Sequence, residues 1–244
     1  MSLVPNAGVR CRRETLAVHL LGLVDFESVL ELQQRMLDEV AASGGRKGIL
    51  FLCEHPPVIT MGREASVTQL ECTPEEQASR QLAVHWLSRG GGCFVHTPGQ
   101  LAIYPVVDVN AGGSHAVQTM QQCETAVLES CLESEVLAWT DSREPGVWCR
   151  GGQLACTGLR VHDGITQYGL FLNVAPNMDL VRLAHPVMAA RLTSLSAERQ
   201  QLVPMAGVRE RVMRHLSRQL GFDHYHLFTG HPLLRRTRRI VAYA

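Results

Sequence analysis

The spacing of apolar side chains predicts several helices along the chain. Apolar residues recur at intervals of three and four from Asp25 to Ala41, which is the spacing of one helix face. That face carries Val29, Leu32, Met36 and Val40. Three further helices are expected from caps and spacing, one starting at Thr73-Pro-Glu-Glu76 and two over residues 115–131 and 206–220. Gly221 is a natural end for the last of them.

Short apolar runs between these helices predict strands. They cover residues 49–53, 58–61, 84–87, 101–107, 146–149, 153–161 and 165–174. The last two runs turn at Asp163-Gly164, which is a strong hairpin signal. Pro105 has no N–H to donate, so we expect its strand to lie at an edge or to carry a bulge. Because helices and strands alternate irregularly and without repeats, the predicted class is α+β.

Composition narrows the class of protein. The 244 residues are 45% hydrophobic and 19% charged, which is ordinary for a globular domain. The formal net charge is zero, so we expect no nucleic-acid partner. No apolar run approaches the roughly 20 residues of a membrane span, and no secretory signal precedes the domain, so we expect no membrane partner and a cytoplasmic protein. The eight cysteines include no Cys-x-x-Cys pair, so we expect reduced thiols and no metal site.

The most informative stretch for chemistry is Arg89-Gly-Gly-Gly-Cys-Phe-Val-His96-Thr-Pro-Gly-Gln100. Three consecutive glycines expose backbone N–H groups and let a ligand approach without interference from a Cβ atom. Arg89 could pair with a carboxylate or a phosphate. Taken alone, a stretch of this kind is more often a surface loop than a binding site.

A second stretch, Glu54-His-Pro-Pro-Val-Ile-Thr-Met-Gly-Arg63, adds a family resemblance. Together the two stretches resemble the octanoyltransferases of lipoate synthesis, within the biotin/lipoate protein ligase superfamily. Other segments continue the resemblance in the right order over roughly residues 20 to 220. They are Tyr104-Pro-Val-Val-Asp108, Pro145-Gly-Val-Trp148, Gly158-Leu-Arg-Val161, Gly169-Leu-Phe-Leu-Asn173 and Leu192-Thr-Ser-Leu195.

The resemblance implies a fold, a reaction and a set of boundaries. It implies a single mixed-sheet domain with flanking helices over residues 16–230, an N-terminal extension over 1–15 and an Arg-rich tail over 231–244. The family moves an octanoyl group from acyl carrier protein to a lysine of a lipoyl domain, and no cofactor is expected. A cysteine holds the acyl group as a thioester, and a lysine lowers the pKa of that thiol.

Both catalytic positions of the family are substituted in this chain. Ungapped spacing places Gln153 at the lysine position and Val187 at the cysteine position. Valine offers no nucleophile, and an amide cannot act as a cationic proton shuttle, so the family mechanism cannot operate as written. Met188 replaces a family glycine, and Tyr168 stands where the family has a histidine.

Replacements for the missing groups are few. Lys47 is the only lysine, and we expect it to lie in a solvated turn before a strand. Cys156 follows Gln153 by three residues, so regular strand alternation would point it to the opposite face. Cys93 is expected to point away from His96 in the same way. His96 and His185 remain candidate acid–base groups without an obvious nucleophile.

Three functions therefore remain open. The first is a catalytically degenerate acyl-binding protein; the second is a transferase in which the lipoyl-domain lysine attacks the bound thioester directly. The third is altered chemistry on a different acyl or amide substrate around His96, Tyr168 and His185. By family resemblance, the expected partners are acyl carrier protein, lipoyl domains and an octanoyl or other medium-chain acyl group. The resemblance implies these substrate-binding residues: Arg89, Gly90, Gly91, Gly92, Cys93, Phe94, Val95, His96, Cys156, Thr157, Gly158, Gly169, Leu170 and Phe171.

Overall fold

The computed structural model describes residues 13–111, 115–141, 143–184 and 191–234. Its centre is an eight-stranded mixed sheet with the strand order β13-β1-β2-β6-β12-β9-β8-β7. The strands are β1 (Arg13–Leu23), β2 (Lys47–Glu54), β6 (Gln100–Val106), β7 (Ala138–Trp139), β8 (Val147–Cys149), β9 (Gly152–Thr157), β12 (Leu170–Asn173) and β13 (Phe222–Thr229). Residues 13–15, which the sequence assigns to the extension, are the first residues of β1.

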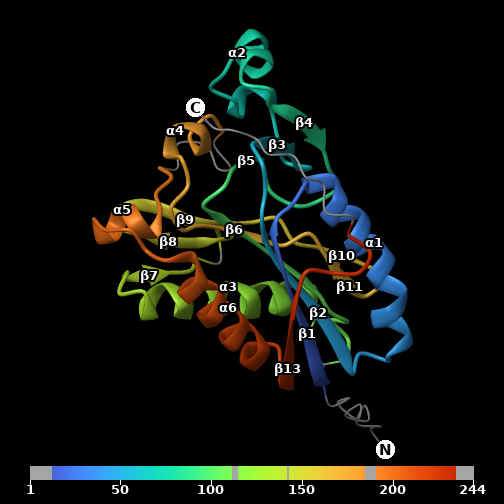
Figure 1. Ribbon diagram of the computed structural model, residues 1–244. Coiled ribbons are helices and arrows are strands. Elements are labelled where there is room, and N and C mark those ends of the chain that lie inside the picture. Colours follow the sequence, from blue (N-terminus) through green and yellow to red (C-terminus); the bar gives the residue numbers. More distant parts are fainter. Residues whose placement is uncertain (1–12, 112–114, 142, 185–190, 235–244) are drawn as a thin grey trace, which may run out of the picture.

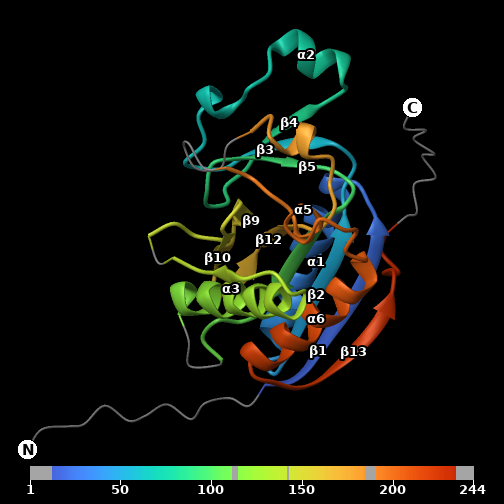
Figure 2. The ribbon, with the colours of Figure 1, turned by 90° about the vertical axis from the view of Figure 1, so that its left-hand side faces the viewer.

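Helices cover both faces of this sheet (Figures 1 and 2). On one face, α3 (Ala116–Glu133) and α6 (Met205–Gln219) bury Cys123, Val127, Val208 and Val212 against the strands. On the other face, α1 (Phe26–Ala42) buries the predicted stripe of Val29, Leu32, Met36 and Val40. The two apolar layers confirm the predicted class, a single mixed sheet with flanking helices.

A smaller three-stranded sheet closes one end of the molecule (Figure 1). Its strands are β3 (Val58–Met61), β4 (Ala83–Trp86) and β5 (Cys93–His96). The 3-10 helix η1 (Val67–Gln69) and α2 (Pro74–Ser79) join β3 to β4. The remaining elements are β10 (Arg160–His162), β11 (Ile165–Gln167), α4 (Met178–Val181) and α5 (Leu195–Arg199).

Local signals in the sequence identify the helix ends and the hairpin. Thr73 and Glu76 form the predicted capping box of α2. Gly221 follows α6 with a φ of +73°, a conformation that glycine adopts without strain. Strands β10 and β11 pair as the predicted hairpin across Asp163-Gly164, and both turn residues have positive φ.

Two strand predictions need correction. Pro105 lies in β6, an inner strand between β2 and β12, and not at an edge or a bulge. The strand tolerates proline because β12 pairs with β6 only as far as Ile103, so the ladder on that side has already ended. The long strands expected over 153–161 and 165–174 are each broken in two, at Gly158 and at Gly169.

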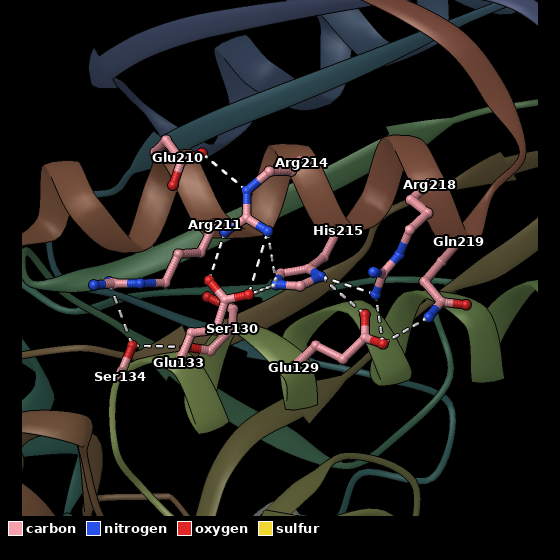
Figure 3. Close-up of polar contacts among 10 residues, drawn as sticks. All are labelled: Glu129, Ser130, Glu133, Ser134, Glu210, Arg211, Arg214, His215, Arg218 and Gln219. Atoms are coloured by element: carbon pink, nitrogen blue, oxygen red, sulfur yellow. Dashed lines mark hydrogen bonds and ion pairs between the residues drawn. The ribbon is translucent and has the colours of Figure 1, made fainter.

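An ionic network joins α3 to α6 (Figure 3). The buried ring of His215 has its two nitrogens 3.0 Å from a carboxylate oxygen of Glu129 and 2.9 Å from one of Glu133. Arg214 and Arg218 add further contacts to the same two carboxylates, at 2.5 and 2.6 Å. The network fixes how α6 lies along α3, and α3 in turn supports the site described next. In the part of the chain described, no helix is long and apolar enough to cross a membrane.

Candidate active site

The glycine-rich loop is held by the turn that follows β3. The backbone N–H of Gly62 donates to the carbonyl of Gly92 at 3.1 Å, and that of Arg63 donates to the carbonyl of Arg89 at 3.0 Å. A Cβ atom at Gly62 would lie only 2.1 Å from the carbonyl oxygen of Gly91, so no other residue fits there. The two stretches that suggested the family thus form one interlocked unit.

The three predicted binding segments meet at this unit. Phe171 of β12 pairs with Cys156 of β9, and its ring lies 5.6 Å from the ring of Phe94 in β5. Gly158 donates its N–H to the carbonyl of Gly169 at 2.8 Å, which joins the second segment to the third. Leu170 pairs with Thr157 in the same ladder. Residues 89–96, 156–158 and 169–171 are therefore neighbours in space.

Arg89 is completely buried, and its side chain joins β3 to the glycine-rich loop. Its Nη2 donates to the carbonyl oxygen and to the hydroxyl of Thr60, each at 2.7 Å, and its Nη1 donates to the carbonyl of Gly90. The guanidinium lies 3.7 Å from the ring centroid of Phe94, in cation–π geometry. Burial lowers the pKa of Arg89 to about 10, so it remains a cation at neutral pH.

His96 takes part in a continuous chain of hydrogen bonds. Because the amide oxygen of Gln100 can only accept, the proton of the neutral His96 ring lies on Nδ1, and Nε2 accepts from the Thr60 hydroxyl at 2.9 Å. Nδ1 of His96 then donates to the amide oxygen of Gln100 at 3.0 Å, and the Gln100 amide nitrogen donates to Asn173 at 2.9 Å. Burial, reinforced by the neighbouring His55 and by the charge of Arg89, holds the pKa of His96 well below its usual value. Both ring nitrogens are occupied inside the protein, so His96 has no free position for acid–base work.

Gln153, which the family resemblance places at the lysine position, is buried in β9. Its amide nitrogen donates to the carbonyl oxygen of Pro145 at 3.2 Å, and its amide oxygen lies 3.7 Å from Sγ of Cys156. The expectation that Cys156 points to the opposite face is therefore wrong. The cause is a β-bulge: Trp148 pairs with Gln153 and Val147 with Ala155, so Leu154 is an extra residue that shifts the alternation.

Cys156 is nevertheless a poor nucleophile. Its side chain is buried, and burial raises the pKa of its thiol to about 12 in spite of the nearby Arg89. Cys93 shares that obstacle, with a pKa also raised by burial to about 12. Cys93 packs with Ile59 and Met61, whereas the ring of His96 contacts Phe26 and Phe171, as the predicted alternation requires.

Other candidates lie elsewhere or outside the described residues. Lys47 is exposed, as expected, but it is the first residue of β2 and does not lie in the turn before that strand. Tyr168 bridges to the hydroxyl of Ser88 at 3.2 Å across the loop. Val187, His185 and Met188 lie outside the described residues. Within the described residues, no group of three or more His, Cys, Asp or Glu side chains could hold a metal ion.

Glu124 is a buried site residue that the sequence analysis missed. It lies on α3, only 4% exposed, and one of its carboxylate oxygens accepts from the N–H of Gly146 and from the hydroxyl of Thr157, each at 2.7 Å. Burial raises the pKa of this carboxyl, and the two hydrogen bonds oppose that shift. The signal available in the sequence was a single acid between Cys123 and the apolar positions Ala126 and Val127, since a buried carboxylate needs a polar partner.

Fold and site together define a lipoyl ligase type of catalytic domain. A family model described as the lipoyl protein ligase A/B catalytic domain matches residues 25–217, and the chain belongs to this family. Within it, the chain is similar to octanoyltransferases: that of Chloroflexus aggregans is 33% identical over 207 residues, which are 83% of this chain and 93% of the relative.

Solved structures show the same fold at low sequence identity. Lipoate-protein ligase A bound with ATP superposes with a TM-score of 0.72 and 15% identity, over 91% of this chain and 90% of that one. A bipartite lipoate protein ligase of Thermoplasma acidophilum, studied with its E2 lipoyl domain, gives a TM-score of 0.64 and 15% identity, over 91% and 89% of the two chains.

Proposed function

We propose that the protein binds an octanoyl or other medium-chain acyl group and does not form the covalent acyl-enzyme of its relatives. The observation that carries the proposal is Gln153: a neutral amide fills the buried lysine position, and both its ends are hydrogen-bonded inside the protein. The cysteine position holds Val187. Burial raises the pKa of the two described thiols beside the site, Cys93 and Cys156, and outweighs the opposing charge of the nearby Arg89.

The binding half of the proposal is supported by what the chain retains. The glycine loop, the Cys156-Thr-Gly158 segment and the Gly169-Leu-Phe171 segment lie together, as a shared ligand site requires. The acyl group would arrive on acyl carrier protein, and a lipoyl domain is the second proposed partner. Octanoyltransferase relatives and the archaeal ligase studied with its lipoyl domain support that choice.

The test is a titration with octanoyl-carrier protein, followed by calorimetry, with the carrier lacking an acyl group as the reference ligand. Gly90→Val is the informative variant, because a Cβ at Gly90 would meet only the carbonyl oxygen of Leu159, at an ordinary 3.5 Å. The fold should survive while the new side chain obstructs the loop, so we expect at least tenfold weaker binding of the acylated carrier. Gly207→Ala, on α6, is the matched control. Equal affinity for acylated and unacylated carrier would contradict acyl binding.

A second candidate function is direct transfer without an acyl-enzyme. It is favoured by the same retained segments, since a bound thioester could be attacked by the lysine of a lipoyl domain through positioning alone. The two functions differ in one measurable product, the octanoylated lipoyl domain.

A further inference from the structure

One peptide group joins position 153 to a buried carboxylate. The peptide between Pro145 and Gly146 accepts at its carbonyl oxygen from the Gln153 amide, at 3.2 Å. The N–H of the same peptide donates to the carboxylate of Glu124, at 2.7 Å. Gln153 in β9 and Glu124 on α3 are thus connected through one peptide group, which each of them can polarise.

The geometry at this peptide is tightly constrained. A Cβ atom at Gly146 would lie 2.5 Å from the Gln153 amide nitrogen and 2.5 Å from the carbonyl oxygen of Ala155. Gly146 also has a φ of +130°, which side-chain-bearing residues rarely adopt. Thr157 fixes the carboxylate from the other side through its hydroxyl, at 2.7 Å. Glycine at 146 is what lets the peptide come this close to position 153.

We propose that Glu124 is a positioning residue that acts through the Pro145–Gly146 peptide and makes position 153 a site for a cation. A carboxylate bound to the N–H end of a peptide draws charge toward the carbonyl end, so the oxygen becomes a stronger acceptor. Little solvent screens the effect, because Glu124 and Gln153 are both buried. Position 153 is the family lysine position, so the counter-charge for an ammonium group persists in a chain that carries an amide there.

The charged and titratable groups around position 153 determine how much the Glu124 carboxylate matters for a cation there. Arg89 lies on the Cys156 side of position 153 and would repel a cation there. The thiol of Cys156 is neutral at ordinary pH, and Cys123 beside Glu124 is a neutral thiol as well, its pKa raised by burial to about 12. Glu124 is therefore the acid that balances a positive charge at 153 among these neighbours. The inference rests on the proposed function only in treating position 153 as part of the acyl site.

The single lysine of the chain makes a direct test possible. A Gln153→Lys variant labelled with ¹³C-lysine gives two side-chain signals, one of which belongs to the exposed Lys47 and serves as an internal reference. We expect the introduced ammonium to bind its proton at least tenfold more tightly with Glu124 present than in the Gln153→Lys, Glu124→Gln double variant. Glu133→Gln, on the same helix but facing α6, removes a charge without touching the peptide and should leave the titration within twofold. Equal titration with and without the Glu124 carboxylate would overturn the proposal.

A second measurement covers the case in which Gln153→Lys does not fold. In the unaltered chain, the Gly146 amide proton and the Gln153 side-chain amide protons should shift with one common midpoint as Glu124 titrates. Glu124→Gln should abolish both shifts. A Gly146 shift without any Gln153 shift would overturn the relay. Neither measurement reads acyl binding, so failure of the relay and failure of the proposed function are distinguished.

Discussion

The polar side chains at the centre of the candidate site bond to one another. Arg89 donates to Thr60, Thr60 to His96, His96 to Gln100 and Gln100 to Asn173, each step at 3.0 Å or less. In this series of hydrogen bonds each side chain donates to the next one, always in the direction from Arg89 to Asn173. Such a buried network fixes the geometry of these side chains and engages both ring nitrogens of His96, which leaves that ring no free position to exchange a proton with a substrate.

Buried neutral histidines make the protein sensitive to acid. His55 is held between the carbonyl of Val24 and the hydroxyl of Tyr104, and burial lowers its pKa to about 4. Between about pH 6.5 and pH 4 the unfolded chain binds a proton at this histidine and the folded chain does not, so acid favours unfolding. We expect His55 alone to remove about 3 kcal/mol of stability over that window.

Urea unfolding at pH 7.5, 6 and 4.5 measures this dependence. His55→Gln keeps a donor and an acceptor but cannot titrate, so its stability should vary less with pH than that of the unaltered protein. The exposed His224→Gln is the matched control and should keep the original slope. A His55→Gln slope equal to that of the unaltered chain would refute this assignment.

Thiol reactivity should follow exposure and thiolate content. Cys72 is half-buried, whereas Cys156 is buried with a pKa of about 12. We expect iodoacetamide at pH 8 to label Cys72 in the folded protein at least a hundredfold faster than Cys156, because about one thiol in ten thousand is ionised at Cys156. Peptide mass mapping over time gives both rates. Comparable rates would revive Cys156 as a relocated nucleophile.

At the scale of elements, glycines set how closely strands and loops approach. A Cβ atom at Gly169 would lie 1.8 Å from the carbonyl oxygen of Ile103, which is rigid backbone in β6. We expect Gly169→Ala to cost about 2 to 3 kcal/mol of unfolding free energy, because β12 must move away from β6.

A matched glycine lies in α6. A Cβ at Gly207 would meet only the flexible end of Arg211, at 3.3 Å, and alanine favours a helix by up to about 1 kcal/mol. Gly207→Ala should therefore be neutral or stabilising in the same urea titration. Equal losses for the two alanine variants would show that backbone contact at Gly169 is not what matters.

Elements with strong local signals were predictable from the sequence, and those set by neighbours were not. The stripe of α1, the capping box of α2 and the turn at Asp163-Gly164 are encoded within a few residues. The β9 bulge depends on how β8 pairs with it, and the position of Pro105 depends on where β12 ends. Both are tertiary effects that a single strand's pattern cannot contain.

At the scale of the whole molecule, the motifs predicted which segments would gather but not how. Residues 89–96 lie about sixty positions before 156–158 and 169–171 in the chain, and all three segments meet in space. The hydrogen bonds of these segments could be identified only in the three-dimensional structure. They engage both ring nitrogens of His96 and place Cys156 beside Gln153. Glu124 was missed because its partners, Gly146 and Thr157, are more than twenty residues away along the chain.

A cysteine at 187 and a lysine at 153, where the family resemblance places these two groups, should give the protein covalent chemistry. We expect the Val187→Cys, Gln153→Lys double variant to form a hydroxylamine-sensitive octanoyl adduct when mixed with octanoyl-carrier protein. Each single variant should form at least a hundredfold less, since nucleophile and activating lysine work as a unit. Intact mass measured under denaturing conditions detects the adduct. A folded double variant that never acylates would show that the rest of the site has also diverged from the family.

The central claim is that the unaltered chain holds an acyl group without covalent transfer. Intact-mass spectrometry of the protein with octanoyl-carrier protein and a lipoyl domain tests it most directly. The account predicts an unmodified protein and an unmodified lipoyl domain under denaturing conditions, with a protein–acyl-carrier complex visible under native conditions. Octanoylation of the lipoyl domain, or a thioester adduct on this chain, would contradict it.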